Sequence, residues 1–299
     1  MTAPYGSRLG RQVARRGPLC VGVDPHPAVL RDWGLPVDVH GLERCARGLV
    51  DALGSTVAVF KPQSAFFEAY GSAGVAVLER VLADIAQAGA LSLLDVKRGD
   101  IGSTMDAYAA AYLTDGSSLA ADAVTLSPYL GFGSLAGAIE LAGQQGRGVY
   151  VLALTSNPEA PPLQHALTAA GPTVAQSIVD AAAAANAAAL SLDDAPAPDA
   201  DADAEERHTA RLGHVGLVVG ATIGRTGLDF SRLNGSILAP GLGAQGATAE
   251  DLVAVFGPAL PLVLPTSSRG VMAAGPDQAS LRTAAERLRG AMETVTSVR

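Results

Sequence analysis

Short apolar runs recur along the chain, separated by stretches in which apolar residues return every three or four positions. Runs of four to eight apolar residues are typical of strands buried on both faces, and the intervening periodicity is typical of amphipathic helices. Eight runs fit the strand pattern: residues 19–24, 57–62, the run that begins at 91, and then 123–128, 148–155, 214–221, 236–243 and 261–268.

Helical periodicity occupies most of the gaps between these runs. The clearest case covers residues 72–88 and is followed by Gly89, where a glycine commonly ends a helix. T-V-A-Q at 173–176 matches a capping box, which predicts a helix start. The other helical patterns cover about 5–17, 38–53, from 103 onward, 173–191 and 277–294.

Buried strands that alternate with helices predict a parallel sheet covered by helices. Eight such units in 299 residues favour an α/β fold of the (β/α)8 TIM barrel type, as a single domain over 1–299 with residues 1–17 as a lead-in helix. A doubly wound open sheet is the alternative. The barrel is favoured because polar residues follow the C-terminal ends of many strands, which meet at one mouth: Asp24, Lys61, Asp95, Lys97, Ser156, Gln245 and Arg269.

Residues 193–211 depart from this pattern, because they consist mainly of Asp, Glu, Ala and Pro. Such a sequence buries too little apolar area to offset the entropy of ordering, so we expect a mobile, low-complexity surface insertion within the barrel. The formal net charge is −8, and residues 193–206 hold seven acids and no base, which leaves about −1 for the rest of the chain. The remainder has neither an acidic surface for a cationic partner nor a basic cluster for nucleic acid.

The remaining composition favours a soluble cytoplasmic protein. No apolar stretch is long enough to span a bilayer, and the first residues lack the apolar core of a signal peptide. Cys20 and Cys45 are expected to be buried free thiols. The five histidines form no H-x-x-x-H pair, so we expect no histidine-built metal site.

The candidate chemistry centres on D-V-K-R-G-D-I-G-S-T at residues 95–104. Residues i and i+2 of a strand share a face, so Asp95 and Lys97 are expected to point the same way, with Asp100 following a turn at Gly99. Burying two acids around one lysine is costly. A structural ion-pair cluster explains D-x-K alone, whereas the full string favours a catalytic site.

Two glycine-rich loops, G-L-G-A-Q-G-A at 241–247 and S-S-R-G at 267–270, follow the seventh and eighth runs. Backbone N–H groups of such loops bind phosphate, and loops after strands seven and eight are the recurrent phosphate site of this barrel. Arg269 supplies a planar donor fork, and Gln245 is placed to close over the anion. A tight turn explains one glycine-rich loop alone, whereas two such loops with an arginine after strands seven and eight favour a phosphate site.

These residues, with F-K-P-Q-S-A-F-F-E, S-P-Y-L-G, L-T-S-N-P-E and A-P-G-L-G-A-Q-G, strongly resemble the orotidine 5′-monophosphate decarboxylase family. The resemblance is to its longer bacterial branch (type 2). It extends from about Leu19 to Arg282, apart from the acidic insertion. It implies a barrel homodimer that removes CO2 from orotidine 5′-monophosphate to give UMP in pyrimidine biosynthesis, with neither a cofactor nor a metal.

The same resemblance implies roles for individual residues. Lys97 would protonate C6 of the pyrimidine, and Asp95 would lie beside the departing carboxylate. Asp100 and Thr104 would act in the active site of the neighbouring subunit. The implied substrate contacts are Asp24 and Lys61 at the ribose, Ser156 at the pyrimidine, and Gln245 and Arg269 at the phosphate. For Asp24 and Ser156, a purely structural role in a proline-containing turn is the rival interpretation.

Two other functions fit parts of the pattern. One is a magnesium-dependent sugar-phosphate lyase or decarboxylase on a related barrel that shares D-x-K-x-x-D. The other is a protein that binds a nucleotide phosphate without catalysis.

Overall fold

Eight parallel strands close into a barrel in the computed structural model, which describes residues 2–191, 212–243 and 246–297. Each strand pairs with its sequence neighbours, and β1 pairs with β8 to close the ring. The strands are β1 (Cys20–Val23), β2 (Val59–Pro62), β3 (Leu91–Arg98), β4 (Ala123–Leu126), β5 (Gly148–Leu154), β6 (Val215–Val219), β7 (Ile237–Pro240) and β8 (Val263–Ser267). The predicted (β/α)8 barrel is therefore confirmed, and all eight strands lie within the predicted runs.

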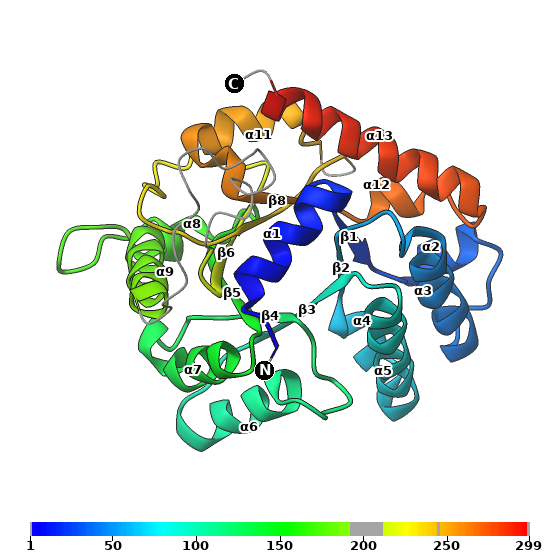
Figure 1. Ribbon diagram of the computed structural model, residues 1–299, viewed down its shortest axis with the longest axis horizontal. Coiled ribbons are helices and arrows are strands. Elements are labelled where there is room, and N and C mark those ends of the chain that lie inside the picture. The colour runs from blue at the N-terminus through cyan, green and yellow to red at the C-terminus, as the bar shows by residue number, and fades with distance from the viewer. Residues whose placement is uncertain (1, 192–211, 244–245, 298–299) are drawn as a thin grey trace.

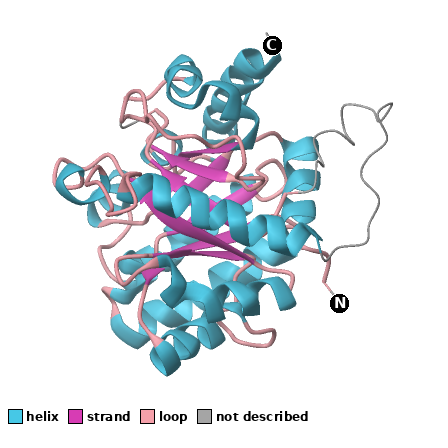
Figure 2. Ribbon diagram, turned by 90° about the vertical axis from the view of Figure 1, so that its left-hand side faces the viewer, coloured by secondary structure: helices cyan, strands magenta, loops and turns pink. Residues whose placement is uncertain are grey.

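Helices surround the strands on the outside of the barrel (Figures 1 and 2). The longer ones are α1 (Tyr5–Arg16), α3 (Val39–Leu53), α5 (Gly71–Gln87), α6 (Gly102–Leu113), α7 (Ala136–Gln144), α9 (Val174–Ser191), α11 (Ala249–Phe256) and α13 (Gln278–Ser297). The shorter ones are α2 (Pro27–Asp32), α4 (Ser64–Glu68), α8 (Pro161–Gln164), α12 (Arg269–Met272) and the 3₁₀ turns η1 (Phe132–Leu135) and η2 (Gly257–Leu262). The short helices span fewer than two turns, so apolar periodicity could not reveal them.

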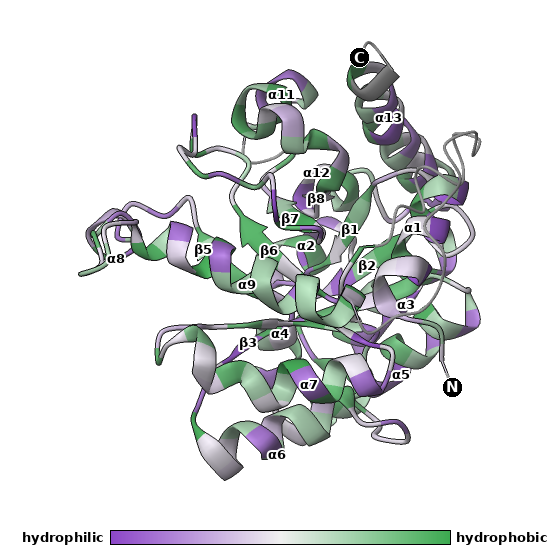
Figure 3. Ribbon diagram, turned by 60° about the vertical axis from the view of Figure 1, so that its left-hand side comes forward, coloured by the Kyte–Doolittle hydropathy of each residue, from purple (hydrophilic) through white to green (hydrophobic). Residues whose placement is uncertain are grey.

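The core has two layers, because successive strand residues point to opposite faces. On β3, Leu93 packs in the barrel interior, while Leu94 packs between the strand and the helices. On β5, Tyr150 points inward and Val149 points outward. Figure 3 shows the matching pattern on the helices, whose ribbons carry apolar and polar stripes. Burial on both faces explains why the strands read as nearly continuous apolar runs.

The local sequence signals for helix ends are confirmed at the end of α5 and only partly at the start of α9. Gly89 has φ 67° and follows α5, and the Ala90 amide donates to the Ile85 carbonyl, as in a Schellman motif. The predicted capping box at the start of α9 is only half formed. The Thr173 hydroxyl accepts from the Gln176 amide, but the Gln176 side chain binds Asp180 and the backbone of Asp229 instead of returning to residue 173. A tertiary contact therefore replaces the reciprocal half of the box.

Helix α1 lies across the N-terminal end of the barrel, inside the ring of the other helices (Figure 1). The Tyr5 hydroxyl hydrogen-bonds the Tyr150 hydroxyl at 3.0 Å, and the two buried rings meet edge-on. At the other end of the helix, the Arg16 guanidinium donates to three backbone carbonyls, those of Gly54, Val57 and Ala88. These contacts close this end of the barrel.

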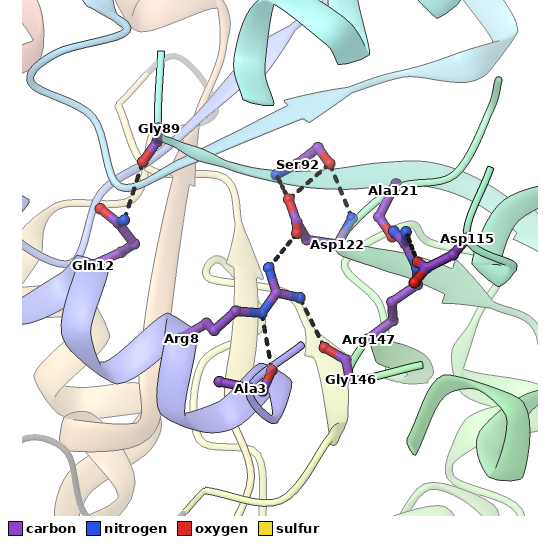
Figure 4. A network of polar contacts seen from close by, with 10 residues as sticks. All are labelled: Ala3, Arg8, Gln12, Gly89, Ser92, Asp115, Ala121, Asp122, Gly146 and Arg147. Carbon is purple, nitrogen blue, oxygen red and sulfur yellow. Dashed lines mark hydrogen bonds and ion pairs between the residues drawn. The ribbon is translucent and has the colours of Figure 1, made fainter. Parts of the chain in front are cut away.

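Arg8 forms the central polar contact of this closure (Figure 4). Its guanidinium pairs with Asp122 and donates to the Gly146 carbonyl at 2.8 Å. The other carboxylate oxygen of Asp122 accepts from the amide and hydroxyl of Ser92, at 2.8 and 3.1 Å. Because Ser92 is on β3 and Asp122 precedes β4, α1 is fastened to the strand starts, and the opposite mouth is left for a ligand.

Within the described residues, no helix is both long and apolar enough to cross a bilayer. The predicted acidic insertion at 193–211 lies outside the described residues.

We predict that Arg8→Met lowers the free energy of unfolding by about 2 kcal/mol, because it leaves the part-buried Asp122 carboxylate without its cation. Urea unfolding followed by circular dichroism would measure this. Arg11→Met is the matched control, since Arg11 is exposed on the same helix. If both substitutions lowered the free energy of unfolding equally, the proposed stabilisation by the Arg8–Asp122 pair would be wrong.

Candidate active site

The C-terminal end of β3 is irregular. Leu94 pairs with Val124 of β4, and the next paired residue on β3 is Arg98, opposite Leu126. Three residues of β3 therefore face a single residue of β4, Thr125, which forms a bulge. Lys97 lies in this bulge with φ 46°, a left-handed conformation that is uncommon for a residue other than glycine. Its backbone N–H donates to the Thr125 hydroxyl at 3.0 Å, so the bulge leaves no orphaned donor there.

The Asp95 carboxylate is the centre of the site. One oxygen accepts from Lys97 Nζ at 2.6 Å and from the Thr125 hydroxyl at 2.8 Å. The other accepts from Lys61 Nζ at 3.0 Å and from the Gln63 amide at 2.9 Å. A carboxylate has about four lone-pair positions, and all four are used here. As predicted, the side chains of Asp95 and Lys97 point to the same side of the strand, where they form an ion pair.

Burial makes these charges interact strongly. Asp95 is 7% exposed and Lys61 5%. Burial alone would raise the pKa of the Asp95 carboxyl, but the Lys61 and Lys97 ammonium groups outweigh it and hold that pKa well below its usual range. Burial alone would lower the pKa of Lys61, but the carboxylates of Asp95 and Asp24 raise it above its usual range. At neutral pH the site therefore contains an ionised carboxylate and a buried ammonium.

Lys97 differs from Lys61 in facing open space. Its side chain is 45% exposed and lines a cavity of about 270 Å³ at the C-terminal mouth of the barrel. An ammonium has three N–H donors, and Asp95 accepts one of them. The remaining donors are available to a ligand in the cavity.

The mouth cavity gathers most of the predicted site residues. Its polar lining includes Asp24, Lys61, Asp95, Lys97, Ser156 and Arg269. A shallower hollow of about 590 Å³ adjoins it on the side of His26 and Phe66, and the two share Asp24, Gln63, Asp95, Lys97 and Arg269. The cavity of about 270 Å³ is the candidate binding site, because it contains the charged cluster and reaches the loops after β5, β7 and β8.

Asp24 supplies an unfilled acceptor in this cavity. It directly follows β1, and its Oδ1 is buried without a hydrogen-bond partner among the described residues. An orphaned buried carboxylate oxygen is costly, so a ligand hydroxyl that donated to it would be bound favourably. The position suits a polyhydroxylated group such as a sugar.

Arg269 lines the cavity from the segment that follows β8. It is the first residue of α12, just after β8, and its side chain is exposed. The loop after β7 lies beside it, because the Leu242 amide donates to the Thr266 carbonyl. Gly241 and Gly243 have φ of 123° and 81°, a backbone path that only glycine follows readily. Gln245, predicted for the same loop, lies outside the described residues.

Ser156 lies on the loop after β5 and lines the cavity. Gln164 of α8 fixes this loop, because its amide oxygen accepts from the Thr155 backbone N–H and its amide nitrogen donates to the Thr155 hydroxyl. Gly220 at the end of β6 packs close by, where an added Cβ would lie 3.2 Å from the Ser156 Cβ. The loop is therefore held at a fixed distance from the cavity.

Asp100 and Thr104 do not line the cavity of their own chain. Asp100 accepts a hydrogen bond from the Ile101 amide at 2.8 Å, and Thr104 is exposed on α6. Asp100 therefore lies in the β3–α6 connection, and Thr104 lies in the first turn of α6.

Gln63 and Thr125 are site residues that the sequence analysis did not single out. Each supplies a hydrogen bond to Asp95, and each stands out in the sequence as a polar residue at or just after an apolar strand. That signal is weak, because it does not show which acceptor the side chain reaches. Within the described residues, no three His, Cys, Asp or Glu side chains are grouped as metal ligands.

Known proteins match this chain over nearly its whole length, and not only in the motifs. The sequence profile of the orotidine 5′-phosphate decarboxylase / HUMPS family matches residues 17–284. The orotidine 5′-phosphate decarboxylase of Salinispora arenicola is 58% identical over 284 residues, which cover 95% of each chain. That of Streptomyces coelicolor is 50% identical and covers 99% of this chain and 98% of the relative.

Solved structures agree with this comparison. A Streptomyces avermitilis crystal structure assigned to the same decarboxylase superposes with a TM-score of 0.89 at 51% identity, covering 99% of this chain and 97% of that one. The OMP decarboxylase of Leishmania donovani superposes with a TM-score of 0.69 at 26% identity, covering 97% and 99%. The chain therefore belongs to the orotidine 5′-phosphate decarboxylase / HUMPS family.

Proposed function

We propose that this protein decarboxylates orotidine 5′-monophosphate to UMP and CO2, with Lys97 as the proton donor to C6 of the pyrimidine. The observation that carries the proposal is the Asp95 carboxylate, which is saturated by four donors and holds the Lys97 ammonium at 2.6 Å at the edge of the mouth cavity. Family membership over nearly the full chain supports the same reaction.

The chemistry follows from where the charge develops. Loss of CO2 from C6 leaves an electron pair in the plane of the pyrimidine ring, where the π system cannot delocalise it. An ammonium held beside that carbon lowers the energy of the developing carbanion and then transfers a proton to it. Two unit charges 4 Å apart at an effective dielectric of 20 interact by about 4 kcal/mol, which corresponds to roughly three decades in rate.

Other parts of the cavity supply the remaining stabilisation. Asp95 directs the ammonium, and its negative charge lies beside the carboxylate that leaves. Asp24 and Lys61 hold the ribose hydroxyls, Ser156 contacts the pyrimidine, and Arg269 and the glycine-rich loop that includes Gln245 bind the phosphate. Binding energy from the phosphate and ribose can then be used to position C6 against Lys97.

The alternative of a magnesium-dependent lyase is less consistent with this geometry. A divalent cation binds carboxylate oxygens directly, but both Asp95 oxygens already accept hydrogen bonds from ammonium, amide and hydroxyl donors. A metal would have to displace a lysine from a buried ion pair. A non-catalytic binding role would leave unexplained why Lys97 is held in an unfavourable backbone conformation.

We further propose a homodimer in which Asp100 and Thr104 complete the partner's site as a catalytic and a substrate-binding residue. Neither residue lines the cavity of its own chain. The surface beside them is unusually apolar, with Ile101, Tyr129 and Leu130 all exposed. The ends of β3 and β4 lie together, because the Ser127 amide donates to the Arg98 carbonyl. A second copy that buried this apolar surface would bring Asp100 to a shared site.

We also propose that the chain acts as one barrel domain in the cytoplasm, with 1–17 as its lead-in helix. Cys20 and Cys45 are both free and buried, which suits a reducing compartment. The mobile character expected for 193–211 stays a prediction.

The loss of ultraviolet absorbance of orotidine 5′-monophosphate on mixing with the enzyme tests the reaction. We expect turnover that is unchanged by EDTA, because the metal position is already filled by lysine. Lys97→Ala should reduce kcat by more than about a thousandfold while leaving the circular dichroism spectrum unchanged. Absence of turnover by the wild-type protein at micromolar concentration would refute the assignment, and abolition by EDTA would favour the magnesium-dependent lyase.

Arg269→Ala is expected to raise KM for the nucleotide by about 10- to 100-fold, because it removes a charge-assisted contact to phosphate. Steady-state kinetics measure the change, with Arg11→Ala on the distant helix α1 as the control. An unchanged KM would contradict the phosphate assignment.

Co-expression of Lys97→Ala and Asp100→Ala chains with different tags tests the shared site. If Asp100 crosses the interface, each heterodimer regains one intact site, and a random mixture recovers about a quarter of wild-type activity. Recovery should be absent if Asp100 acts within its own chain, because every site then carries one of the two substitutions.

A further inference from the structure

Arg98, which directly follows the catalytic lysine, is directed toward the outer helices. Its guanidinium donates to Glu68 Oε1 at 2.6 Å and to the Tyr112 hydroxyl at 3.2 Å. The same group lies over the Tyr108 and Tyr112 rings, 5.5 and 5.8 Å from their centroids. Arg98 therefore contacts α4 through Glu68 and α6 through the two tyrosines.

These contacts link the elements on both sides of the charged cluster. Glu68 is itself fixed, because the Ser64 hydroxyl donates to its Oε1 at 2.6 Å. Helix α4, which contains both residues, is joined to β2 by Gln63 alone. Gln63 and Lys61 of β2 are two of the donors to Asp95. The Arg98 side chain therefore connects the end of β3 to the segment that contains Lys61 and Gln63.

The backbone conformation of Lys97 explains why such a contact is needed. Lys97 has φ 46° within the bulge, and backbone conformations of this kind persist only when the surroundings hold them. On the inner side the bulge is held by Thr125, which binds both the Lys97 amide and Asp95. On the outer side the next residue, Arg98, carries the side chain that fixes the end of the strand. Without that anchor, the bulge could relax and withdraw the ammonium from the cavity.

We propose that Arg98 is a positioning residue, which acts with Glu68 and the tyrosines of α6 as an outer clamp that keeps Lys97 at its catalytic position. The proposal rests on the proposed decarboxylase function, since it concerns the placement of that reaction's proton donor. Arg98 and Glu68 line the shallower hollow beside the cavity but not the mouth cavity itself. The proposed effect of Arg98 is transmitted through the backbone of the β3 bulge. Lysine cannot replace it fully, because an ammonium lacks the planar fork and the stacking surface that reach Glu68 and both tyrosines together.

The experiment is steady-state decarboxylation of orotidine 5′-monophosphate by Arg98→Met. Misplacing a catalytic group by about 1 Å can cost two decades in rate, so we expect kcat to fall by about 10- to 100-fold. Phosphate and ribose contacts are left in place, so KM should change by less than about threefold. Arg98→Lys should recover only part of kcat. Glu68→Gln, which keeps the shape but removes the charge, should lower kcat in the same direction by less.

Arg147→Met is the matched control. Arg147 is a part-buried arginine that pairs with Asp115 and the Ala121 carbonyl on the opposite end of the barrel (Figure 4). We expect it to lower the melting temperature about as much as Arg98→Met but to leave kcat unchanged. If Arg98 only stabilised the fold, Arg98→Met and Arg147→Met would have the same kcat.

The outcomes separate the two proposals. An active wild-type enzyme whose kcat is unaffected by Arg98→Met and Glu68→Gln overturns the clamp while leaving the decarboxylase function intact. A drop in kcat matched by an equal drop with Arg147→Met also overturns it. An inactive wild-type protein overturns the proposed function instead.

Discussion

A single buried carboxylate, that of Asp95, constrains the arrangement of the whole catalytic mouth. A carboxylate that is 7% exposed cannot stay ionised without compensation, and the chain supplies two ammonium groups, an amide and a hydroxyl. These four donors come from β2, β3, β4 and the turn after β2. The position of each strand end is therefore linked to the others through one anion, and the lysine that faces the cavity is held in place as a consequence.

The two ends of the barrel are built for different purposes. At the N-terminal end, α1 covers the opening, and the polar groups of Tyr5 and Arg8 are bound by partners on the strand side. At the C-terminal end, polar groups are left with unused capacity, such as the orphaned oxygen of Asp24 and the free donors of Lys97. Satisfied polar groups stabilise a fold, whereas unsatisfied ones at a cavity are available to bind a ligand.

The β3 bulge shows how stability and function are balanced locally. A regular ladder would pair Asp95, Val96 and Lys97 with β4, but the register skips them and places Lys97 in a left-handed conformation. The bulge turns the lysine toward Asp95 and the cavity. Its inner face is held by Thr125, and its outer face is held by Arg98 through Glu68 and the tyrosines of α6. A strained element at a site thus depends on contacts from two layers of the barrel.

The sequence by itself determined the eight strands, the barrel and the residues at its mouth, because hydrophobic periodicity is local and polar residues at strand ends are visible in one dimension. The D-x-K spacing also predicted that Asp95 and Lys97 point the same way. In the structure this direction comes from the β3 bulge and not from regular strand alternation. Tertiary structure alone decided which partners those residues reach. Gln63 and Thr125 bind Asp95 only because of the register between strands about 30 residues apart. The same reason explains why Gln176 leaves its capping box for Asp229, and why Arg98 reaches Glu68: such contacts depend on packing between elements, which no local pattern encodes.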